Sequence, residues 1–475
     1  MKVIKGTFSR CAPNARRELI LFAVMIISVL SACVPASHQR VVVCGMSDLG
    51  AVLLSAEVTT KIDNIVIGEL GEFMTLPAGA SCPHQWQRTD FAPINSRMLD
   101  GKRGWFVTGT EVELGGTVFR LNWQNTQVET WFQLPKGDFV LDVIWSETQG
   151  WQALTVGGNP DCGDIPRGNE YNRIRCAQRS GALYLVDDSG YYRELREASG
   201  TGRCYGVFNP QADAVAFVES EECFAYDDAS SQTVVLNLDS GQSWVLSGNN
   251  EGGKPYWSPD GEEIVFEVAS GVVTAKLIPP GYTLAGAIGE IRAADVESKQ
   301  VRVLWPTSGS SSADYCGFAT SPHVWSSDGQ HLALACYAGL GSTQMRSLDI
   351  LNVNEDNMFS VCSIASDDSY SLSWYPVDWS PDGNWVEWLS SYRPDVGYEF
   401  YFQNLQNNES RNLLVQSSDN LLWLRWSLDG NTLGAIRTAG EQGYLDLYSW
   451  GDFNVTATVE LPKGVNWSDV YWVSE

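Results

Sequence analysis

The chain has 475 residues, of which 44% are hydrophobic and 19% charged, with 19 Trp, 18 Tyr and 17 Phe. This much apolar side chain can bury a large core, which excludes a mainly disordered protein. The formal net charge of −26 argues against nucleic acid and anionic lipid as partners, because both would be repelled unless a local basic patch intervened. Solubility is the simplest role for this acidity.

The amino terminus has the pattern of an export signal. Arg16 and Arg17 precede an apolar run, Leu19 to Leu30, of 12 residues, which is too short to span a bilayer but suits a signal-peptide core. The run ends in Leu30-Ser31-Ala32-Cys33, which resembles the lipobox of bacterial lipoproteins. The resemblance implies removal of residues 1–32 and attachment of diacylglycerol to Cys33.

That interpretation predicts a protein of the bacterial cell envelope, lipid-anchored outside the cytoplasm, with residues 33–45 as a lipidated tether and residues 46–475 as the folded domain. Removal of the signal takes the net charge to −30. An ordinary signal peptide with a chance Cys and a twin-arginine signal are the alternatives. Export holds under all three.

Cysteine spacing predicts disulfides in an oxidising compartment. Of the 11 Cys, Cys11 lies in the signal and Cys33 is the lipid site, so nine remain and cannot all pair. Local spacing favours the pairs Cys44–Cys82, Cys162–Cys176, Cys204–Cys223 and Cys316–Cys336, with Cys362 left over. No Cys-x-x-Cys or His-x-x-x-His spacing occurs, so we expect neither structural zinc nor another cofactor.

An internal repeat dominates the rest of the sequence. Four copies of Trp-Ser-x-Asp-Gly, each followed by an apolar run, begin at Trp257, Trp325, Trp379 and Trp426. We expect a strand that ends in Trp, a tight turn in which Asp accepts local N–H groups and Gly is left-handed, and a second strand. Weaker copies at Ser47–Gly50, Leu99–Gly101, Trp145–Ser146 and Phe208–Pro210 bring the number of units to eight.

The spacing between copies leaves room for a third strand and usually a fourth, as at Leu183–Val186 and Tyr192–Leu195. Four strands in each repeat are typical of a propeller blade. We therefore predict an all-β protein with a single closed β-propeller of four-stranded blades, in which Tyr471–Val473 pairs with the first blade and closes the ring. Eight blades are favoured, and seven is the alternative if residues 41–97 form an accessory segment.

The Trp-Ser-Pro-Asp-Gly units resemble the TolB-type, WD40-like β-propeller family, and they cover nearly all of the mature chain. The chain departs from TolB itself because it has a lipobox and no recognisable amino-terminal α/β domain. The resemblance therefore implies the propeller fold and leaves the partner open. The Trp residues of the repeat could stack on sugars, but their repeated position favours packing between blades.

Long connections indicate where a ligand would bind. The segments 77–95, 158–180, 269–288 and 306–321 are all expected on one face of the ring, whereas the turns on the other face are short. Between Cys162 and Cys176 this face would carry Arg167, Tyr171, Arg173 and Arg175, a basic patch suited to a carboxylate, a phosphate or an acidic glycan. Alternatively, these Arg residues pair with acidic residues of the same loop.

No Gly-x-Ser-x-Gly elbow or phosphate-binding loop is present. The sequence favours a binding or protein-interaction module anchored to the membrane through Cys33, with an unknown protein or glycan ligand on the long-loop face and no nucleic acid. The alternative is a propeller enzyme, a hydrolase or lyase, that acts on polysaccharide through scattered carboxylates.

Overall fold

The computed structural model describes most of the folded domain. The described residues are 38–47, 50–61, 64–70, 74–75, 105–109, 116–122, 127–157, 161, 176, 181–199, 201–220, 231–248, 251–269, 288–306, 314–319, 324–338, 345–355, 357–363, 378–393, 397–415, 421–440, 442–461 and 466–474. Within these ranges no helix has the length and hydropathy that crossing a bilayer requires. The expected signal peptide and Cys33 lie outside them.

The described strands form eight antiparallel sheets. The first contains β1 (His38–Ser47), β2 (Gly50–Lys61), β3 (Asn64–Leu70), β4 (Met74–Thr75) and β32 (Asn466–Ser474). The second contains β5 (Trp105–Gly109), β6 (Gly116–Asn122) and β7 (Gln127–Leu134). The third contains β8 (Phe139–Ser146), β9 (Gly150–Gly157), β10 (Ala182–Val186) and β11 (Tyr192–Arg196).

The other five sheets are four-stranded meanders in chain order. They contain β12 (Gly202–Phe208), β13 (Ala214–Ser220), β14 (Gln232–Asn237) and β15 (Ser243–Val245); β16 (Pro255–Trp257), β17 (Glu263–Ala269), β18 (Ile288–Asp295) and β19 (Val301–Trp305); β20 (Asp314–Phe318), β21 (His331–Ala338), β22 (Met345–Asn352) and β23 (Asn357–Ser363); β24 (Asp378–Trp379), β25 (Trp385–Arg393), β26 (Gly397–Asn404) and β27 (Ser410–Val415); and β28 (Leu421–Trp426), β29 (Thr432–Ala439), β30 (Gln442–Ser449) and β31 (Val455–Glu460). The prediction of an all-β protein with four-stranded sheets is confirmed for six of the eight described sheets; the first has five described strands and the second three.

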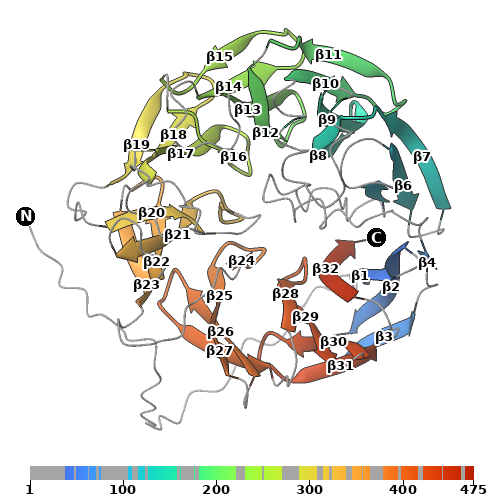
Figure 1. Ribbon diagram of the computed structural model, residues 1–475. Helices are drawn as coiled ribbons and strands as arrows, with labels where there is room; N and C mark the ends of the chain where they lie inside the picture. Colours follow the sequence, from blue (N-terminus) through green and yellow to red (C-terminus); the bar gives the residue numbers. More distant parts are fainter. Residues whose placement is uncertain are drawn as a thin grey trace, which may run out of the picture.

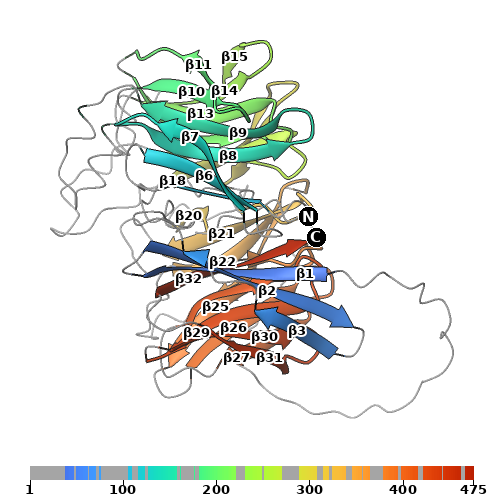
Figure 2. The same cartoon turned by 90° about the vertical axis from the view of Figure 1, so that its right-hand side faces the viewer.

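The sheets stand around a common centre, as Figure 1 shows, with β12, β16, β24, β28 and β32 on the inner side and β15, β19, β27 and β31 on the outer side. Seen from the side, the strands run across the thickness of the molecule (Figure 2). Each sheet therefore presents two edges, one where its first and second strands turn and one where its second and third strands connect.

The last strand joins the first sheet, as predicted. Strand β32 pairs with β1 in the register Val41↔Trp472 and Val42↔Tyr471. The sheet order β3-β2-β1-β32 makes β32 the end strand beside β1, so the turn at Ser47–Gly50 joins the second and third strands of this sheet and not the first and second, as we had expected. Strand β1 also begins at His38, inside the stretch expected to be tether, because the β-branched residues Val41–Val43 suit a strand.

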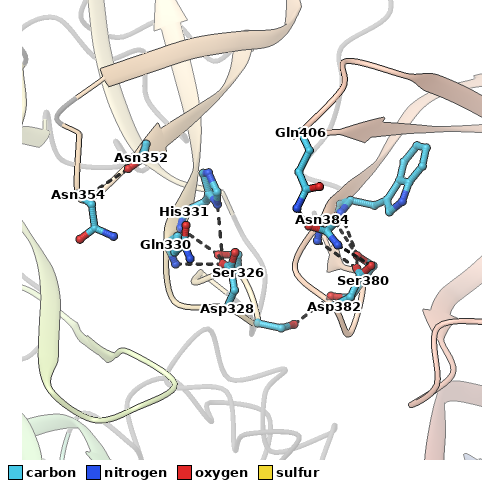
Figure 3. A network of polar contacts seen from close by, with 12 residues as sticks. Ser326, Asp328, Gln330, His331, Asn352, Asn354, Ser380, Asp382, Asn384 and Gln406 are labelled. Atoms are coloured by element: carbon cyan, nitrogen blue, oxygen red, sulfur yellow. Dashed lines mark hydrogen bonds and ion pairs between the residues drawn. The ribbon is translucent and has the colours of Figure 1, made fainter.

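The repeated turn has the expected chemistry, drawn for two copies in Figure 3. In the copy that begins at Ser380, the hydroxyl donates to Asp382 and accepts the Trp385 N–H at 2.9 Å, while Asp382 accepts the Asn384 N–H at 3.0 Å. Gly383 has φ 72°, a left-handed conformation that glycine adopts without a Cβ clash. One Ser and one Asp thus satisfy the N–H groups of the turn.

The repeat Trp packs between sheets, as predicted. Trp325 is 6% exposed, and its indole N–H donates at 3.1 Å to the carbonyl of Tyr256, the residue before Trp257 in the preceding sheet. Trp257 donates at 3.3 Å to Val207, and Trp472 donates at 3.2 Å to Arg425. Because Arg425 also precedes a repeat Trp, β32 occupies the inner-strand position next to β28.

Hydrophobic clusters also join neighbouring sheets. One such cluster combines Leu141 and Leu154 from β8 and β9 with Phe208 and Phe217 from β12 and β13, all fully buried. The core is therefore divided into layers between adjacent sheets, as is usual when sheets pack face to face.

Candidate functional site

The connections between second and third strands mark the edge of the sheets where insertions occur, which we call the loop edge. The stretch 158–180 joins β9 to β10, and 269–288 joins β17 to β18. The interval 306–321, expected to be a connection, instead includes strand β20. Its residues Asp314–Phe318 pair with β21 through Cys316↔Cys336, and the turn copy at Trp325 contributes only a single bridge to Leu332.

The predicted basic patch falls outside the residues that the structure describes. Arg167, Tyr171, Arg173 and Arg175 all lie between Asp161 and Cys176, the nearest described positions. Their role as ligand-binding residues stays a prediction.

The disulfide predictions are tested in part. The Cys316–Cys336 bond is present, with the Cα atoms 4.1 Å apart, and this pairing is confirmed. Cys176 and Cys204 are each disulfide-bonded, but Cys162 and Cys223, their expected partners, lie outside the described residues, as does Cys82, the expected partner of Cys44. The ligand atoms of Cys316, Cys336 and Asp349 lie within 4.8 Å of one another, but the two sulfurs are joined to each other and cannot both bind a metal.

Ion pairs near the loop edge differ from sheet to sheet. Arg203 near the start of β12 donates to Glu219 at 3.2 Å. Arg292 in the middle of β18 contacts Glu251 and Glu290, each at 2.7 Å. Most of these side chains are only partly buried, so each pair adds little stability by itself.

Lys254 lies in the same region, immediately before the inner strand β16. Its ammonium lies 4.9 Å from the centroid of the Tyr256 ring and 6.0 Å from that of Tyr205, within the range of a cation–π interaction. It makes no hydrogen bond or ion pair with any other residue that the structure describes. Burial lowers the pKa of Lys254 to about 8, although the charge of Glu267 opposes this shift.

Glu267 on β17 lies across from Lys254. In the antiparallel register Pro255 pairs with Phe266, so the residue before Pro255, Lys254, faces the residue after Phe266, Glu267. Its carboxylate accepts the backbone N–H of Phe318 at 2.7 Å, and this bond joins two neighbouring sheets. Burial raises the pKa of Glu267 to about 7, while the Phe318 N–H and the charge of Lys254 oppose the rise. Phe318 in turn packs edge-on against Tyr256, with ring centroids 5.0 Å apart.

A second group of inner-strand charges lies between the sheets that contain β24 and β28. Asp378 pairs directly with Glu387 in the strand register, and Arg425 approaches Asp378 at 3.5 Å. Burial, and then the charge of Asp378, raise the pKa of Glu387 well above its usual range, while Arg425 opposes the rise.

Neither inner-strand group was predicted from the sequence, although a signal existed. The Ser-x-Asp-Gly turn fixes the hairpin register, and the register places Lys254 opposite Glu267 and Asp378 opposite Glu387. Long connections and adjacent carboxylates are visible in the sequence, whereas these residues come together only across a hairpin.

Comparison with known proteins gives a fold and no family. No family model matches the sequence, and no curated protein matches it. Among solved structures the chain is similar to dihydro-heme d1 dehydrogenase NirN in complex with DHE, with 11% identity, coverage of 91% of this chain and 74% of that one, and a TM-score of 0.50.

Two further solved structures are similar with lower scores. Oligogalacturonate lyase in complex with manganese has 12% identity, coverage of 85% and 94%, and a TM-score of 0.46. TolB from Acinetobacter baumannii has 14% identity, coverage of 71% and 82%, and a TM-score of 0.29. At such identities the likeness to NirN concerns the fold alone, and the two lower scores support nothing further.

Proposed function

We propose that the protein is a lipoprotein of the bacterial cell envelope whose β-propeller binds a ligand or a protein partner at the loop edge. The observation that supports this most is the difference between the two edges of the sheets. The turns at one edge repeat the same Ser–Asp network, whereas the described inner strands β12 and β16 carry different groups near the other edge, an Arg–Glu pair and a lysine between Tyr rings. Variable side chains on a constant scaffold are typical of recognition.

We further propose that the eight sheets are the blades of one closed ring. The pairing of β32 with β1 and the hydrogen bond from Trp472 to Arg425 support closure by the last strand. Deletion of residues 469–475 is expected to lower the melting temperature sharply, because it exposes the edge of β1. An unchanged melting temperature would argue against closure.

The anchor proposal rests on Leu30-Ser31-Ala32-Cys33 and is tested by fractionation. Replacement of Cys33 with Ser is expected to move the protein from the membrane to the soluble fraction and to remove the mass of the lipid. Continued membrane association with the unmodified mass would contradict the proposal.

The binding function is tested with the mature protein in a screen against cell-wall glycans and envelope proteins. We propose Arg167, Tyr171, Arg173 and Arg175 as contacts, so charge reversal at Arg173 and Arg175 is expected to weaken binding of an acidic ligand without unfolding the protein. Wild-type affinity should then fall as salt rises. A partner whose binding survives excision of residues 163–175 would remove this patch from the site.

An enzyme acting on polysaccharide is a second candidate, favoured by Asp378 and Glu387. A buried carboxyl with a raised pKa, here Glu387, next to a second carboxyl is a common arrangement for acid–base chemistry. The same glycan screen, read for release of reducing ends, tests this function. Loss of activity in Glu387→Gln with unchanged binding would support it, and no release by the wild-type protein would exclude it for the glycans used.

A further inference from the structure

Lys254 lies between two Tyr rings and across from Glu267. A lysine ammonium has three N–H donors, and none of them meets an acceptor among the residues that the structure describes. Contact with two Tyr rings replaces only part of the lost hydration. The group therefore has unused capacity for a hydrogen-bond acceptor, above all a charged one.

The backbone holds this lysine in a fixed position. The Gly252 N–H donates to Ser231 at 3.0 Å, and Gly253 exchanges hydrogen bonds of 2.9 Å in both directions with the Thr233 side chain. A Cβ at Gly253 would lie 1.7 Å from the carbonyl oxygen of Glu267, so only glycine allows this approach. The two glycines tie the segment before Lys254 to the adjacent strands β14 and β17.

The aromatic walls come from separate sheets. Tyr205 lies in a bulge of β12, where the register shifts between Cys204 and Val207, and it has φ 54°. Bulges and positive φ at residues other than glycine are common where a side chain is redirected toward a site. Tyr256 and Phe318 bring two more rings from β16 and β20. Tyr205 and Tyr256 are partly exposed and can contact a ligand.

From this arrangement we propose that Lys254, Tyr205 and Tyr256 form a binding site for a small organic monocarboxylate with an apolar or aromatic body. The ligand carboxylate accepts hydrogen bonds from the Lys254 ammonium, and its body packs against the Tyr rings. A single cation matches a single negative charge. A dianionic phosphate fits less well, because Glu267 stands across from the lysine.

The other charges nearby are already paired. Arg203 contacts Glu219, and Arg292 contacts Glu251 and Glu290. Among the described residues, the titratable groups that face Lys254 are the two Tyr rings and Glu267, and Glu267 is the one carboxyl among them. Since burial raises the pKa of Glu267 to about 7, its protonation below that pH removes a repulsive charge, and carboxylate affinity rises as the pH falls from 8 to 6.

This inference deepens the proposed binding function and rests on it only for the location of the site. The experiment is calorimetric titration of the mature protein with benzoate and phenylacetate, with benzyl alcohol and benzylamine as neutral and cationic probes. We expect saturable binding of a carboxylate, at least tenfold tighter than that of benzyl alcohol.

Two lysine variants provide the decisive comparison. Lys254→Met keeps most of the unbranched side chain and removes the charge, and it is expected to weaken carboxylate binding at least tenfold. Lys299→Met is the matched control, since Lys299 also lies over an aromatic ring, Trp244 at 4.8 Å, but is exposed at the outer side of the sheet. It should leave the affinity unchanged.

Three results would overturn the proposal: no saturable binding of either carboxylate, equal affinity in Lys254→Met and wild type, or tighter binding of benzylamine than of benzoate. Lys254→Arg, which keeps the charge, should retain binding and shows whether any loss in Lys254→Met comes from misfolding. If carboxylates fail to bind while a partner found in the glycan and protein screen depends on residues 163–175, the proposed function stands and this site does not.

Discussion

The two edges of the sheets differ in how much each copy of the repeat may vary. At the turn edge, Ser326 and Asp328 make the same hydrogen bonds as Ser380 and Asp382 in the next sheet (Figure 3). Near the loop edge, neighbouring sheets hold an Arg–Glu pair at Arg203 and a lysine between Tyr rings at Lys254. The repeat therefore fixes the side chains at the turn edge and leaves those near the loop edge able to differ from sheet to sheet.

The largest effect is expected when a repeat Trp that packs between two sheets is removed, because this packing supports both edges. Trp325→Ala removes an indole that is 6% exposed, and it should lower the free energy of unfolding by about 3–5 kcal/mol, as for other buried aromatic residues. Trp325→Phe keeps most of the ring and loses the hydrogen bond to Tyr256, so its cost should be smaller. Chemical denaturation measures both. Equal losses in the two variants would mean that the hydrogen bond, and not the packing, dominates.

The next effect concerns the turn edge alone. Ser380→Ala leaves the Trp385 N–H without its side-chain acceptor, and an unsatisfied buried donor should lower the free energy of unfolding by about 1–3 kcal/mol. Ser410→Ala is the matched control, because the Ser410 hydroxyl also donates, to Gln403 at 2.6 Å, but is exposed. A loss as large at Ser410 as at Ser380 would contradict the role of the turn network. Carboxylate binding should be unaffected by either change.

The pH dependence of folding stability tests Lys254, which lies near the loop edge. Because burial lowers the pKa of Lys254 to about 8 in the folded state, the unfolded chain binds more protons there between pH 8 and about 10.4, the ordinary lysine value. Wild-type stability should therefore rise over this range relative to Lys254→Met, by an amount of order 1 kcal/mol. Parallel stability curves for the two proteins would show that Lys254 titrates normally.

Glu267 should give the opposite trend. Its folded pKa of about 7 lies above the ordinary value, so the stability that it contributes is present at low pH and is lost as the pH rises through 7. Relative to Glu267→Gln, wild-type stability should fall between about pH 4.3 and pH 7. Thermal unfolding across this range measures the difference, and a rise instead of a fall would contradict the shift.

The smallest effect is the difference between two glycine variants, which separates the cost of backbone conformation from that of crowding. Gly430 has φ 71°, and a Cβ there would be 3.7 Å from Pro381, so Gly430→Ala should cost only about 1–2 kcal/mol for the left-handed conformation. Gly383→Ala should cost more, because its Cβ would lie 3.0 Å from the backbone nitrogen of Asp328. Equal losses of stability in the two variants would show that the neighbouring turns can separate without cost.

The contrast between the edges also explains what the sequence could predict. The turns, the strands beside them and the interior position of the repeat Trp follow from local chemistry, since Ser, Asp and Gly act within a few residues of one another. The Cys316–Cys336 bond was predictable from spacing, although the strand that carries Cys316 was mistaken for a connection. Gly317 and the polar residues before it gave no alternating pattern.

The Lys254 group depends on distant parts of the chain. Tyr205 reaches it through a bulge, and Phe318 through the packing of the next sheet. Neither a bulge nor the contact between two sheets leaves a periodic signal in the sequence. The position of Lys254 opposite Glu267 could be predicted from the turn that follows it. Its role as a group between aromatic rings could not, because Tyr205 and Phe318 come from other sheets.

The pairing of β32 with β1 has a consequence for the order of folding. Strand β1 ends at Ser47 and β32 begins at Asn466, so the first sheet has to wait for almost the entire chain before its end strand is available. Contacts between such distant segments form slowly, so the edge of β1 stays unpaired while the rest of the chain folds. Until Trp472 is in place, this edge can pair with a strand of another chain, and a chain that lacks its last residues keeps that edge exposed.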